Sequence, residues 1–189
     1  MKNFIFYFLK IYSKLLFRKN STFGKKFVSG PYGSCTNNSG NLGNILIGDN
    51  CEVHGSLISG IQGQIIIGNF TTLRYNTRVF SVSNIFIGSH VIISNNVTIY
   101  DNNNHPISPS FRLKMSESGF YSDLWGASYS ESSPIIIEDN VWIGERCYIL
   151  KGVTIGKGSI IGLNSVVTKN IPPFSIAVGN PARVVKSLE

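Results

Sequence analysis

A repeat of six residues constrains the fold of this chain more than any other feature. Between residues 133 and 163 an aliphatic side chain recurs at every sixth position, and one more extends the column. The column consists of Ile137, Ile143, Ile149, Ile155, Ile161 and Val167. An α-helix repeats every 3.6 residues and a strand every two, so neither element alone explains this spacing. A period of six is typical of a solenoid whose coils hold three short strands, each turning one side chain toward a common axis.

A second column keeps the same phase. Two residues before each next aliphatic stands a smaller or branched side chain, at Val141, Cys147, Val153, Ser159 and Ser165. Each Ile or Val that is buried in such a stack stabilises the fold by roughly 1.5–3 kcal/mol. The glycines and asparagines beside these columns fall at corners, where positive φ angles are tolerated. An isoleucine-rich β-sandwich is the alternative fold, but it offers no reason for hexads to stay in phase.

The repeat divides a single expected domain into segments. These are an N-terminal amphipathic helix at 1–20, an irregular lead-in at 21–44, the solenoid at 45–178 and a C-terminal tail at 179–189. Ile-Gly pairs at positions 47, 67 and 87 lie twenty residues apart, so each early coil should carry a small corner bulge. The hexads stop over residues 101–134, and a loop this long is functional or disordered. Pro172 and Pro173 are expected to end the coils, because proline cannot donate to a ladder.

The net charge of +7 belongs to the N-terminal part. Residues 1–48 contain no Asp or Glu, whereas from Asp49 onward acidic and basic residues balance. A neutral body argues against a nucleic-acid partner. The helix over residues 1–19 is too short and too rich in lysine to span a bilayer. Two placements are open for it: on the anionic inner face of the cytoplasmic membrane, or against the solenoid or a neighbouring subunit. No A-x-A-like cleavage site is present, so we expect a cytoplasmic protein.

Little in the sequence points to metal or thiol chemistry. The three cysteines, at positions 35, 51 and 147, form no disulfide framework. Cys51 and Cys147 fall in the small inward column, which predicts a packing role. His54 follows a core aliphatic by one position and His90 by three, so they should face different ways and make poor co-ligands. We therefore expect no metal site.

Four motifs accompany the hexads: N-H-P-I-S-P at 104–109, V-W-I-G-x-x-C-x-I at 141–149, S-V-V-T-K-x-I-P-P at 165–173 and G-N-P-A-R-V-V at 179–185. Together they resemble the hexapeptide-repeat acyltransferases, and within these the maltose/galactoside and polysaccharide O-acetyltransferase branch. The resemblance covers residues from about 45 to 186. It implies a left-handed parallel β-helix, assembled as a homotrimer, with acetyl-CoA bound in the groove between subunits.

His105 matches the loop histidine that serves as general base in that family. The chemistry requires such a group, because a sugar hydroxyl is a poor nucleophile at neutral pH. Imidazole can take the hydroxyl proton and later return a proton to the CoA thiolate. No covalent enzyme intermediate is needed, and a backbone N–H near the thioester should stabilise the oxyanion.

The resemblance assigns further residues by position. Asn76 lies near an acceptor-lining asparagine of the family, and Asp101 precedes the histidine loop. Both are predicted to bind the acceptor, and orienting His105 or capping its strand are further roles open to Asp101. The predicted CoA contacts are Trp142, Thr168, Lys169, Arg183 and Lys186, and the cations among them suit the CoA phosphates. Glu145 stands where relatives carry smaller CoA-contacting residues, so this contact departs from the pattern.

The expected function is acetyl-CoA-dependent O-acetylation of a sugar hydroxyl in a bacterial surface polysaccharide or its precursor. Two other enzymatic functions share the fold and the CoA groove: N-acetylation of an amino sugar, nucleotide-linked or free, and acetylation of a drug of the chloramphenicol or streptogramin type. A trimeric scaffold without activity is the non-enzymatic alternative, and the intact N-H-P and T-K…R-V-V elements argue against it.

Overall fold

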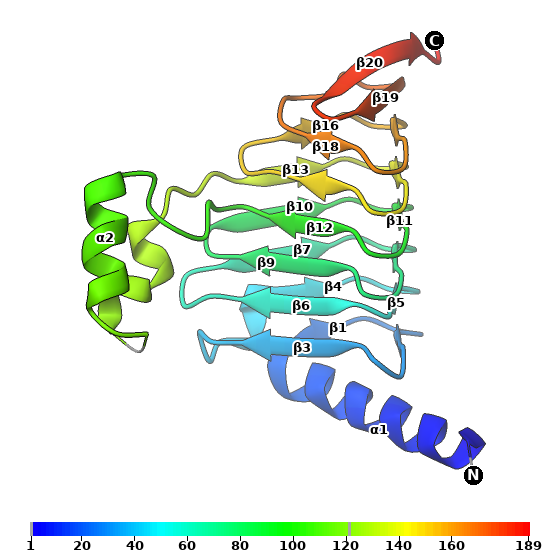
Figure 1. Ribbon diagram of the computed structural model, residues 1–189. Coiled ribbons are helices and arrows are strands. Elements are labelled where there is room, and N and C mark those ends of the chain that lie inside the picture. Colours follow the sequence, from blue (N-terminus) through cyan, green and yellow to red (C-terminus); the bar gives the residue numbers. More distant parts are fainter. Residues whose placement is uncertain (1, 121) are drawn as a thin grey trace.

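The computed structural model describes residues 2–120 and 122–189, and the chain winds through three sheets around one axis (Figure 1). We call them sheets A, B and C in the order in which the chain meets them. Sheet A contains β1 (Thr22–Phe23), β4 (Ile45–Ile47), β7 (Gln64–Ile67), β10 (Asn84–Ile87), β13 (Ile135–Ile137) and β16 (Thr154–Ile155). Sheet B contains β2 (Val28–Ser29), β5 (Glu52–Val53), β8 (Thr72–Leu73), β11 (Ile92–Ile93), β14 (Trp142–Ile143), β17 (Ile160–Ile161), β19 (Ser175–Gly179) and β20 (Ala182–Ser187). Sheet C contains β3 (Ser34–Asn37), β6 (Ser56–Ser59), β9 (Arg78–Ser81), β12 (Thr98–Tyr100), β15 (Tyr148–Ile149) and β18 (Val166–Val167).

The two predicted columns point into the space that the sheets enclose. Every member of both columns is at most 1% exposed. Parallel pairing stacks equivalent residues of successive coils, as in Ile93 on Ile143 on Ile161 within sheet B. The inward positions are therefore confirmed, and the core is a continuous stack of Ile, Val and Leu side chains. We refer to these stacked coils as the coiled body.

The A–B and B–C corners of the coiled body use the left-handed backbone region in successive coils. Between sheets A and B the residues with positive φ include Asn50, Phe70, His90 and Asn140, and between sheets B and C they include Asn76, Asn96, Arg146 and Asn164. The asparagines confirm the corner prediction. Phe70 and His90 are exceptions, since a bulky residue in this region costs about 1–2 kcal/mol. Their rings stack with centroids 5.0 Å apart and nearly parallel planes, which offsets part of that cost.

Residues 21–44 are not an irregular lead-in, and that expectation was wrong. β1, β2 and β3 form a complete first coil that pairs in parallel with β4, β5 and β6. A six-residue spacing is in fact present at Phe23, Ser29 and Cys35, but only the cysteine among them is a small hydrophobe and none is aliphatic. Ser29 and Cys35 are nevertheless buried.

The coils also continue beyond the two prolines, against expectation. β19 follows them and pairs in parallel with β17, and the predicted tail forms β20, which pairs antiparallel with β19. The prolines interrupt no ladder because they lie in a corner. The neighbouring Ile171 still donates its N–H to the Thr154 carbonyl and accepts from the Gly156 N–H.

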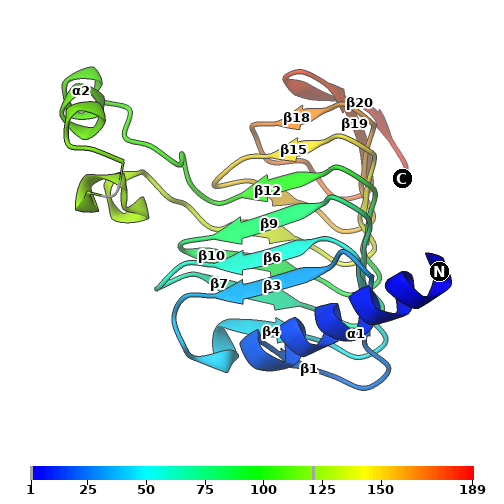
Figure 2. The ribbon, with the colours of Figure 1, turned by 60° about the horizontal axis from the view of Figure 1, so that its bottom comes forward.

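The long insertion leaves the coiled body at the corner between sheets C and A, between β12 and β13 (Figures 1 and 2). It contains α2 (Pro109–Glu117) and two short 3-10 helices, η2 (Asp123–Trp125) and η3 (Ala127–Tyr129). α2 begins with Ser108 as its N-cap and Pro109 in its first turn. A third 3-10 helix, η1 (Leu42–Asn44), precedes β4.

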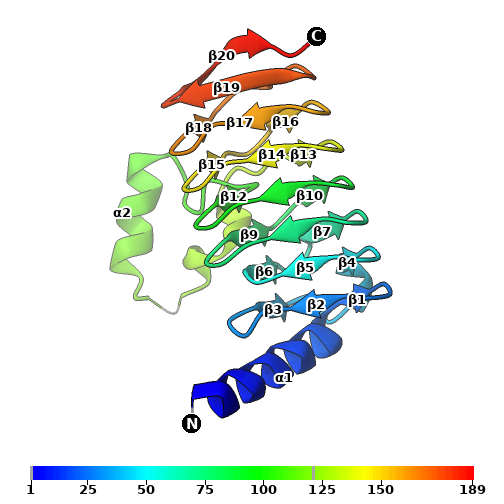
Figure 3. The ribbon, with the colours of Figure 1, turned by 90° about the vertical axis from the view of Figure 1, so that its right-hand side faces the viewer.

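α1 (Lys2–Asn20) covers the N-terminal end of the coiled body, beneath the first coil (Figure 3). Phe17 is fully buried, and its ring lies 5.1 Å from that of Phe27 in the first coil. Of the two predicted placements of the helix, packing against the coils is therefore confirmed for the face that carries Phe17. None of the helices in the described part of the chain has the length and hydropathy needed to cross a membrane.

Candidate functional site

His105 lies at the start of the insertion, directly after the corner. Asn104, in the left-handed region with φ of 65°, turns the chain just before it. The imidazole meets the Trp125 ring edge-to-face, with centroids 5.7 Å apart, so a residue twenty positions later holds the ring plane. Nε2 lies 3.4 Å from the Asn104 amide nitrogen, and Nδ1 is buried with no hydrogen-bond partner among the described residues. The ring is thus held in place by packing, with a nitrogen still unused.

The carboxylate of Asp101 is engaged in hydrogen bonds within the chain. Its side chain is fully buried, and its two oxygens accept from the Ser81 hydroxyl at 2.7 Å and from the Val82 and Ser83 N–H groups at 2.9 Å. The Asn102 amide also donates to it, at 3.2 Å. Its carboxylate therefore ties the start of the insertion to the corner one coil below, and all of its hydrogen bonds go to these groups rather than to His105.

Three of the predicted CoA contacts gather on the outer face of sheet B. Trp142 stacks in register on Ile160, Ile160 on Ile176, and Ile176 pairs with Lys186 of β20. Arg183 lies on the same strand as Lys186, opposite Val178. The column thus runs from a half-exposed indole over two aliphatic side chains to two cations, which is the order of polarity along a pantetheine chain and its phosphates.

Thr168 and Lys169 lie elsewhere, at the corner between sheets C and A. They follow β18 directly and are exposed, two coils above the point where the insertion begins. This corner, where His105 also lies, is opposite sheet B across the coiled body (Figure 1). One chain therefore presents His105 and the predicted CoA contacts in two separate groups, one at the C–A corner and one on sheet B.

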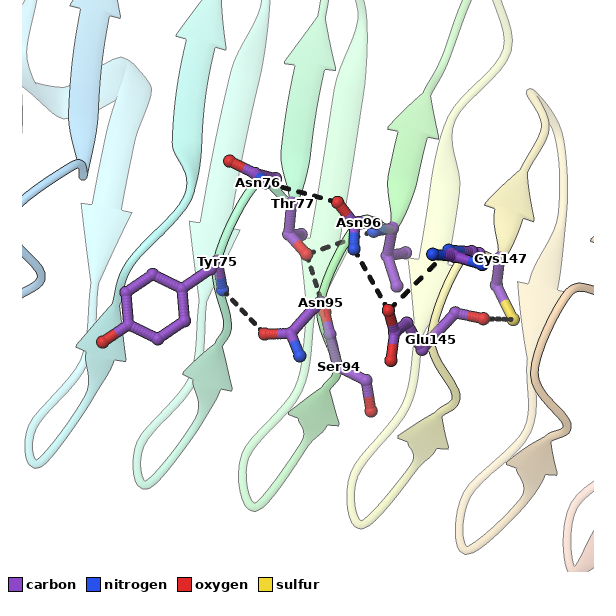
Figure 4. Close-up of polar contacts among 10 residues, drawn as sticks. Tyr75, Asn76, Thr77, Ser94, Asn95, Asn96, Glu145 and Cys147 are labelled. Atoms are coloured by element: carbon purple, nitrogen blue, oxygen red, sulfur yellow. Dashed lines mark hydrogen bonds and ion pairs between the residues drawn. The ribbon is translucent and has the colours of Figure 1, made fainter.

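Asn76 belongs to a third place, an open polar trough on sheet C next to the B–C corner. The trough has a volume of about 410 Å³ and is lined by Ser56, Asn76, Arg78, Asn96, Thr98 and Tyr148. At its rim the Asn76 amide donates to Asn96 at 3.4 Å, and the Asn96 amide donates to Glu145 at 3.2 Å (Figure 4). Glu145 thus faces the corner asparagines, and its carboxylate lies 3.8 Å from the Arg146 guanidinium.

Sequence reasoning missed five residues of this trough, Asn96 at the corner and four on the strands. Ser56, Arg78, Thr98 and Tyr148 pair in register on successive strands of sheet C. Each stands one position before an inward aliphatic, so the same six-residue phase that predicts the core would have aligned them in an outward column. We refer to these four residues and the two asparagines as the sheet C trough.

Cys51 and Cys147 are packed in the core, as predicted, and Cys35 is buried as well. Burial raises the pKa of the Cys35 thiol to about 12, an effect that a hydrogen bond involving Ser21 only partly offsets. Burial likewise raises the pKa values of Cys51 and Cys147. Buried thiols that resist ionisation are poor nucleophiles.

The two remaining histidines face different ways, also as predicted. His54 meets Tyr75 edge-to-face at 4.6 Å, whereas His90 stacks on Phe70 at another corner. Within residues 2–120 and 122–189, no three His, Cys, Asp or Glu side chains converge to hold a metal ion.

Comparison with known proteins gives the family. Residues 134–169 match the family described as bacterial transferase hexapeptide (six repeats). The galactoside O-acetyltransferase of Lactococcus lactis is 35% identical over 143 residues, which cover 75% of this chain and only 62% of that enzyme. An acetyltransferase predicted in Schizosaccharomyces pombe, C18B11.09c, is 33% identical over 179 residues, which cover 93% of this chain and 80% of that protein.

A solved structure shows the same architecture. It is the hexapeptide-repeat containing acetyltransferase VCA0836 of Vibrio cholerae complexed with acetyl coenzyme A, which is 27% identical with a TM-score of 0.63. The alignment covers 98% of this chain and 86% of that one. The inward hexads and the coils of three parallel strands, together with a relative matched over most of both lengths, show that this chain belongs to the hexapeptide-repeat transferase family.

Proposed function

We propose that this chain is an acetyl-CoA-dependent acetyltransferase that acetylates a hydroxyl group of a saccharide, with His105 as general base. The observation that carries the proposal is the imidazole of His105, which a tryptophan holds edge-to-face at the one long break in the repeat. Family membership supports the reaction class, and the galactoside O-acetyltransferase named above supports a sugar hydroxyl as acceptor.

The reaction is a direct transfer. The acceptor oxygen attacks the thioester carbonyl while a ring nitrogen of His105 takes the hydroxyl proton. The tetrahedral oxyanion then collapses, the carbon–sulfur bond breaks, and the imidazolium returns its proton to the departing thiolate. The ring must hold one orientation through both proton transfers, and its packing against Trp125 supplies that orientation.

The active site is proposed to lie between copies of the chain in a homotrimer of left-handed coils. His105, Thr168 and Lys169 lie at the C–A corner, whereas Trp142, Arg183 and Lys186 lie on sheet B. In a cyclic trimer each contact is heterologous, which means that it joins two different surfaces of the chain. Such an arrangement brings the C–A corner of one copy against the edge between sheets B and C of the next. The acetyl-CoA chain would then run along the sheet B column, with its thioester near the neighbouring His105.

The sheet C trough is the proposed acceptor site, on the same B–C edge. Its hydroxyl and amide groups suit the donors and acceptors of a sugar ring. Arg78 forms no ion pair with any described residue, so its guanidinium is available to a carboxylate or phosphate. We therefore propose an anionic saccharide as acceptor, a class that includes acidic surface polysaccharides and lipid-linked precursors.

A pair of histidine variants tests the base. His105→Gln keeps a polar side chain of similar size but cannot shuttle a proton, so kcat should fall about 10²–10⁴-fold. The Kd for CoA, measured by calorimetry, should stay within about threefold of the parent value, a change under 1 kcal/mol. His90→Asn is the matched control, because asparagine tolerates the positive φ at this corner. A His105→Gln protein with near-normal kcat would exclude His105 as the base.

A pair of arginine variants tests the charge of the acceptor. Acidic and neutral oligosaccharides are offered with acetyl-CoA, and product is measured by mass spectrometry. Arg78→Gln should raise KM for acidic acceptors about tenfold or more and leave neutral ones unchanged, as expected for a charged hydrogen bond. Arg74→Gln removes the same charge from a side chain that lies over Tyr75 outside the trough, and it should have little effect. Equal effects of both variants would contradict the assignment.

A further inference from the structure

α1 presents two different faces, and only one of them is covered. Ser13 and Phe17 are buried against the first coil, and Leu9 and Leu16 are half-buried beside them. These positions recur at the spacing of one helix face. The N-terminal half of the helix extends past the edge of the coiled body, beyond sheet B (Figures 1 and 2). The contact with the coils therefore explains one stripe of this helix and leaves the rest without a partner.

The face opposite that contact is apolar. Phe4, Phe8, Ile11 and Leu15 are 67%, 55%, 44% and 55% exposed. At 100° per residue they fall within an arc of about 60°, centred opposite Ser13. The Phe4 and Phe8 rings lie 4.8 Å apart, so the stripe is continuous. Four large side chains held in one line on the solvent side indicate a surface that has an occupant.

Aromatic and basic residues flank the apolar stripe on both sides. Helical spacing places Tyr7, Lys14 and Arg18 along one edge, and Tyr12 and Lys19 along the other. All five are exposed. The first coil adds the exposed Lys25 and Lys26 at the turn between β1 and β2. The sequence up to residue 48 contains no acidic residue, and no ion pair joins these cations to any residue in the described part of the chain.

We infer that α1 docks this protein on an anionic phospholipid bilayer. An apolar stripe bordered by tyrosines and cations is the arrangement that sinks into the headgroup region while its charges meet acidic lipids. The helix runs obliquely below the first coil, so the sheets lie on the side away from the bilayer, and the insertion that carries α2 lies at the side of the coiled body (Figure 3). An acceptor carried on a lipid would then be presented to the flank of the enzyme.

A second copy of the chain fits this face less well. A symmetric contact between two α1 helices would bring the cations Lys14, Arg18 and Lys19 of both copies into one interface, and the helix has no carboxylate to neutralise them. An acidic bilayer supplies the missing negative charge. If the proposed trimer holds, its three helices lie on the same end and bind one membrane together, which multiplies a weak single contact.

Vesicle flotation with the whole 189-residue chain tests the inference. Vesicles of pure phosphatidylcholine are compared with vesicles containing 30% phosphatidylglycerol, a composition set by the experiment, at about 0.05 M and 0.5 M salt, where the Debye length changes severalfold. We expect at least tenfold stronger partitioning to the anionic vesicles and loss of most of that preference at high salt. Phe4→Ser/Phe8→Ser should abolish binding to either vesicle. Lys14→Gln/Lys19→Gln should weaken binding to the anionic vesicles by about fivefold per charge.

Matched controls lie outside α1. Ile61→Ser/Leu163→Ser removes two exposed apolar side chains, and Lys114→Gln/Lys157→Gln removes two exposed cations. Both should float like the parent chain, and all variants should keep the parent circular dichroism because every changed side chain is exposed. Parent-like flotation of the α1 variants would overturn the inference. So would a parent chain that ignores anionic vesicles but loses self-association in Phe4→Ser/Phe8→Ser, since the occupant would then be a second copy. Turnover of a soluble acceptor, measured in parallel, reports separately on the proposed reaction.

Discussion

Replacing Asp101 by asparagine separates a structural role from a role in acceptor binding. One carboxylate oxygen accepts from the Val82 N–H and the Asn102 amide, and the other from the Ser83 N–H and the Ser81 hydroxyl. An amide offers one acceptor and one donor in place of two acceptors. In either orientation its NH₂ group therefore faces a backbone N–H, which loses its partner.

The expected cost follows from these contacts. An unsatisfied buried donor costs about 1–3 kcal/mol, and the remaining bonds lose the strength that the negative charge gave them. We therefore expect Asp101→Asn to lower the free energy of unfolding by about 2–4 kcal/mol, which for a chain of this size corresponds to roughly 4–16 °C in Tm. At temperatures well below the transition, KM for the acceptor should remain near the parent value.

The assay combines urea unfolding, followed by far-UV circular dichroism, with steady-state kinetics. Protein concentration is held constant, because association couples to apparent stability. Asp139→Asn is the control: this exposed carboxylate accepts one N–H bond, from Ser89 at 2.7 Å, and the amide oxygen can still accept it, so the change should stay under about 0.5 kcal/mol. Unchanged stability together with a KM raised tenfold or more in Asp101→Asn would refute the reasoning and restore Asp101 to the acceptor site.

Two further predictions concern the assembly and the buried thiols. If each site lies between copies, co-expressing inactive His105→Ala and Trp142→Ala chains should restore part of the acetyltransferase activity. In the mixed trimers about a quarter of the sites would carry both intact residues. Activity no higher than that of the separate variants would show that each chain forms its own site. The raised pKa of Cys35 means that its thiol ionises in the unfolded chain from about pH 9 but in the folded chain only near pH 12. The contribution of the neutral thiol to stability is thus complete below pH 9 and is lost as pH rises toward 12. The difference in the free energy of unfolding between the parent and Cys35→Ala should therefore shrink by about 2 kcal/mol between pH 8 and pH 10.5. Urea unfolding at the two pH values measures this difference. A difference that is constant or grows with pH would contradict this sign.

The coils can be predicted from the sequence because each strand turns one side chain toward the axis, and this inward residue recurs every six positions. Ile143, Ile149 and Ile155 each lie on a different sheet, and each is buried for the same reason, namely that it stacks on its equivalent one coil away. The first coil was not predicted from the sequence, because Phe23, Ser29 and Cys35 keep the six-residue spacing but are not aliphatic. A periodicity search weighted on hydrophobicity cannot detect an inward serine.

The site is only partly readable from the chain. The break in the hexads marks His105, but the tryptophan that holds its ring comes twenty positions later, and nothing in the sequence pairs the two. Trp142 and Lys186 lie in one column only because β20 turns back on β19, a pairing that the two prolines argue against. For α1, periodicity separates apolar from polar positions, but it cannot tell which apolar stripe meets the coils. Phe17 does, whereas Phe4, Phe8 and Ile11 remain outside.

The repetition of similar coils fails at three places in this chain, and each break adds a feature that the regular coils lack. The insertion interrupts the C–A corner and adds a histidine, the antiparallel β20 closes one end of sheet B and adds two cations, and α1 closes the other end. Ends must be covered in any case, because open coils would expose ladder groups and core side chains. Covering the lower end needs only the stripe that carries Phe17, and burial there does not explain four large apolar residues on the far side. Their exposure costs solubility without adding to the stability of the coils, so a surface outside the chain is the simplest reason for their presence.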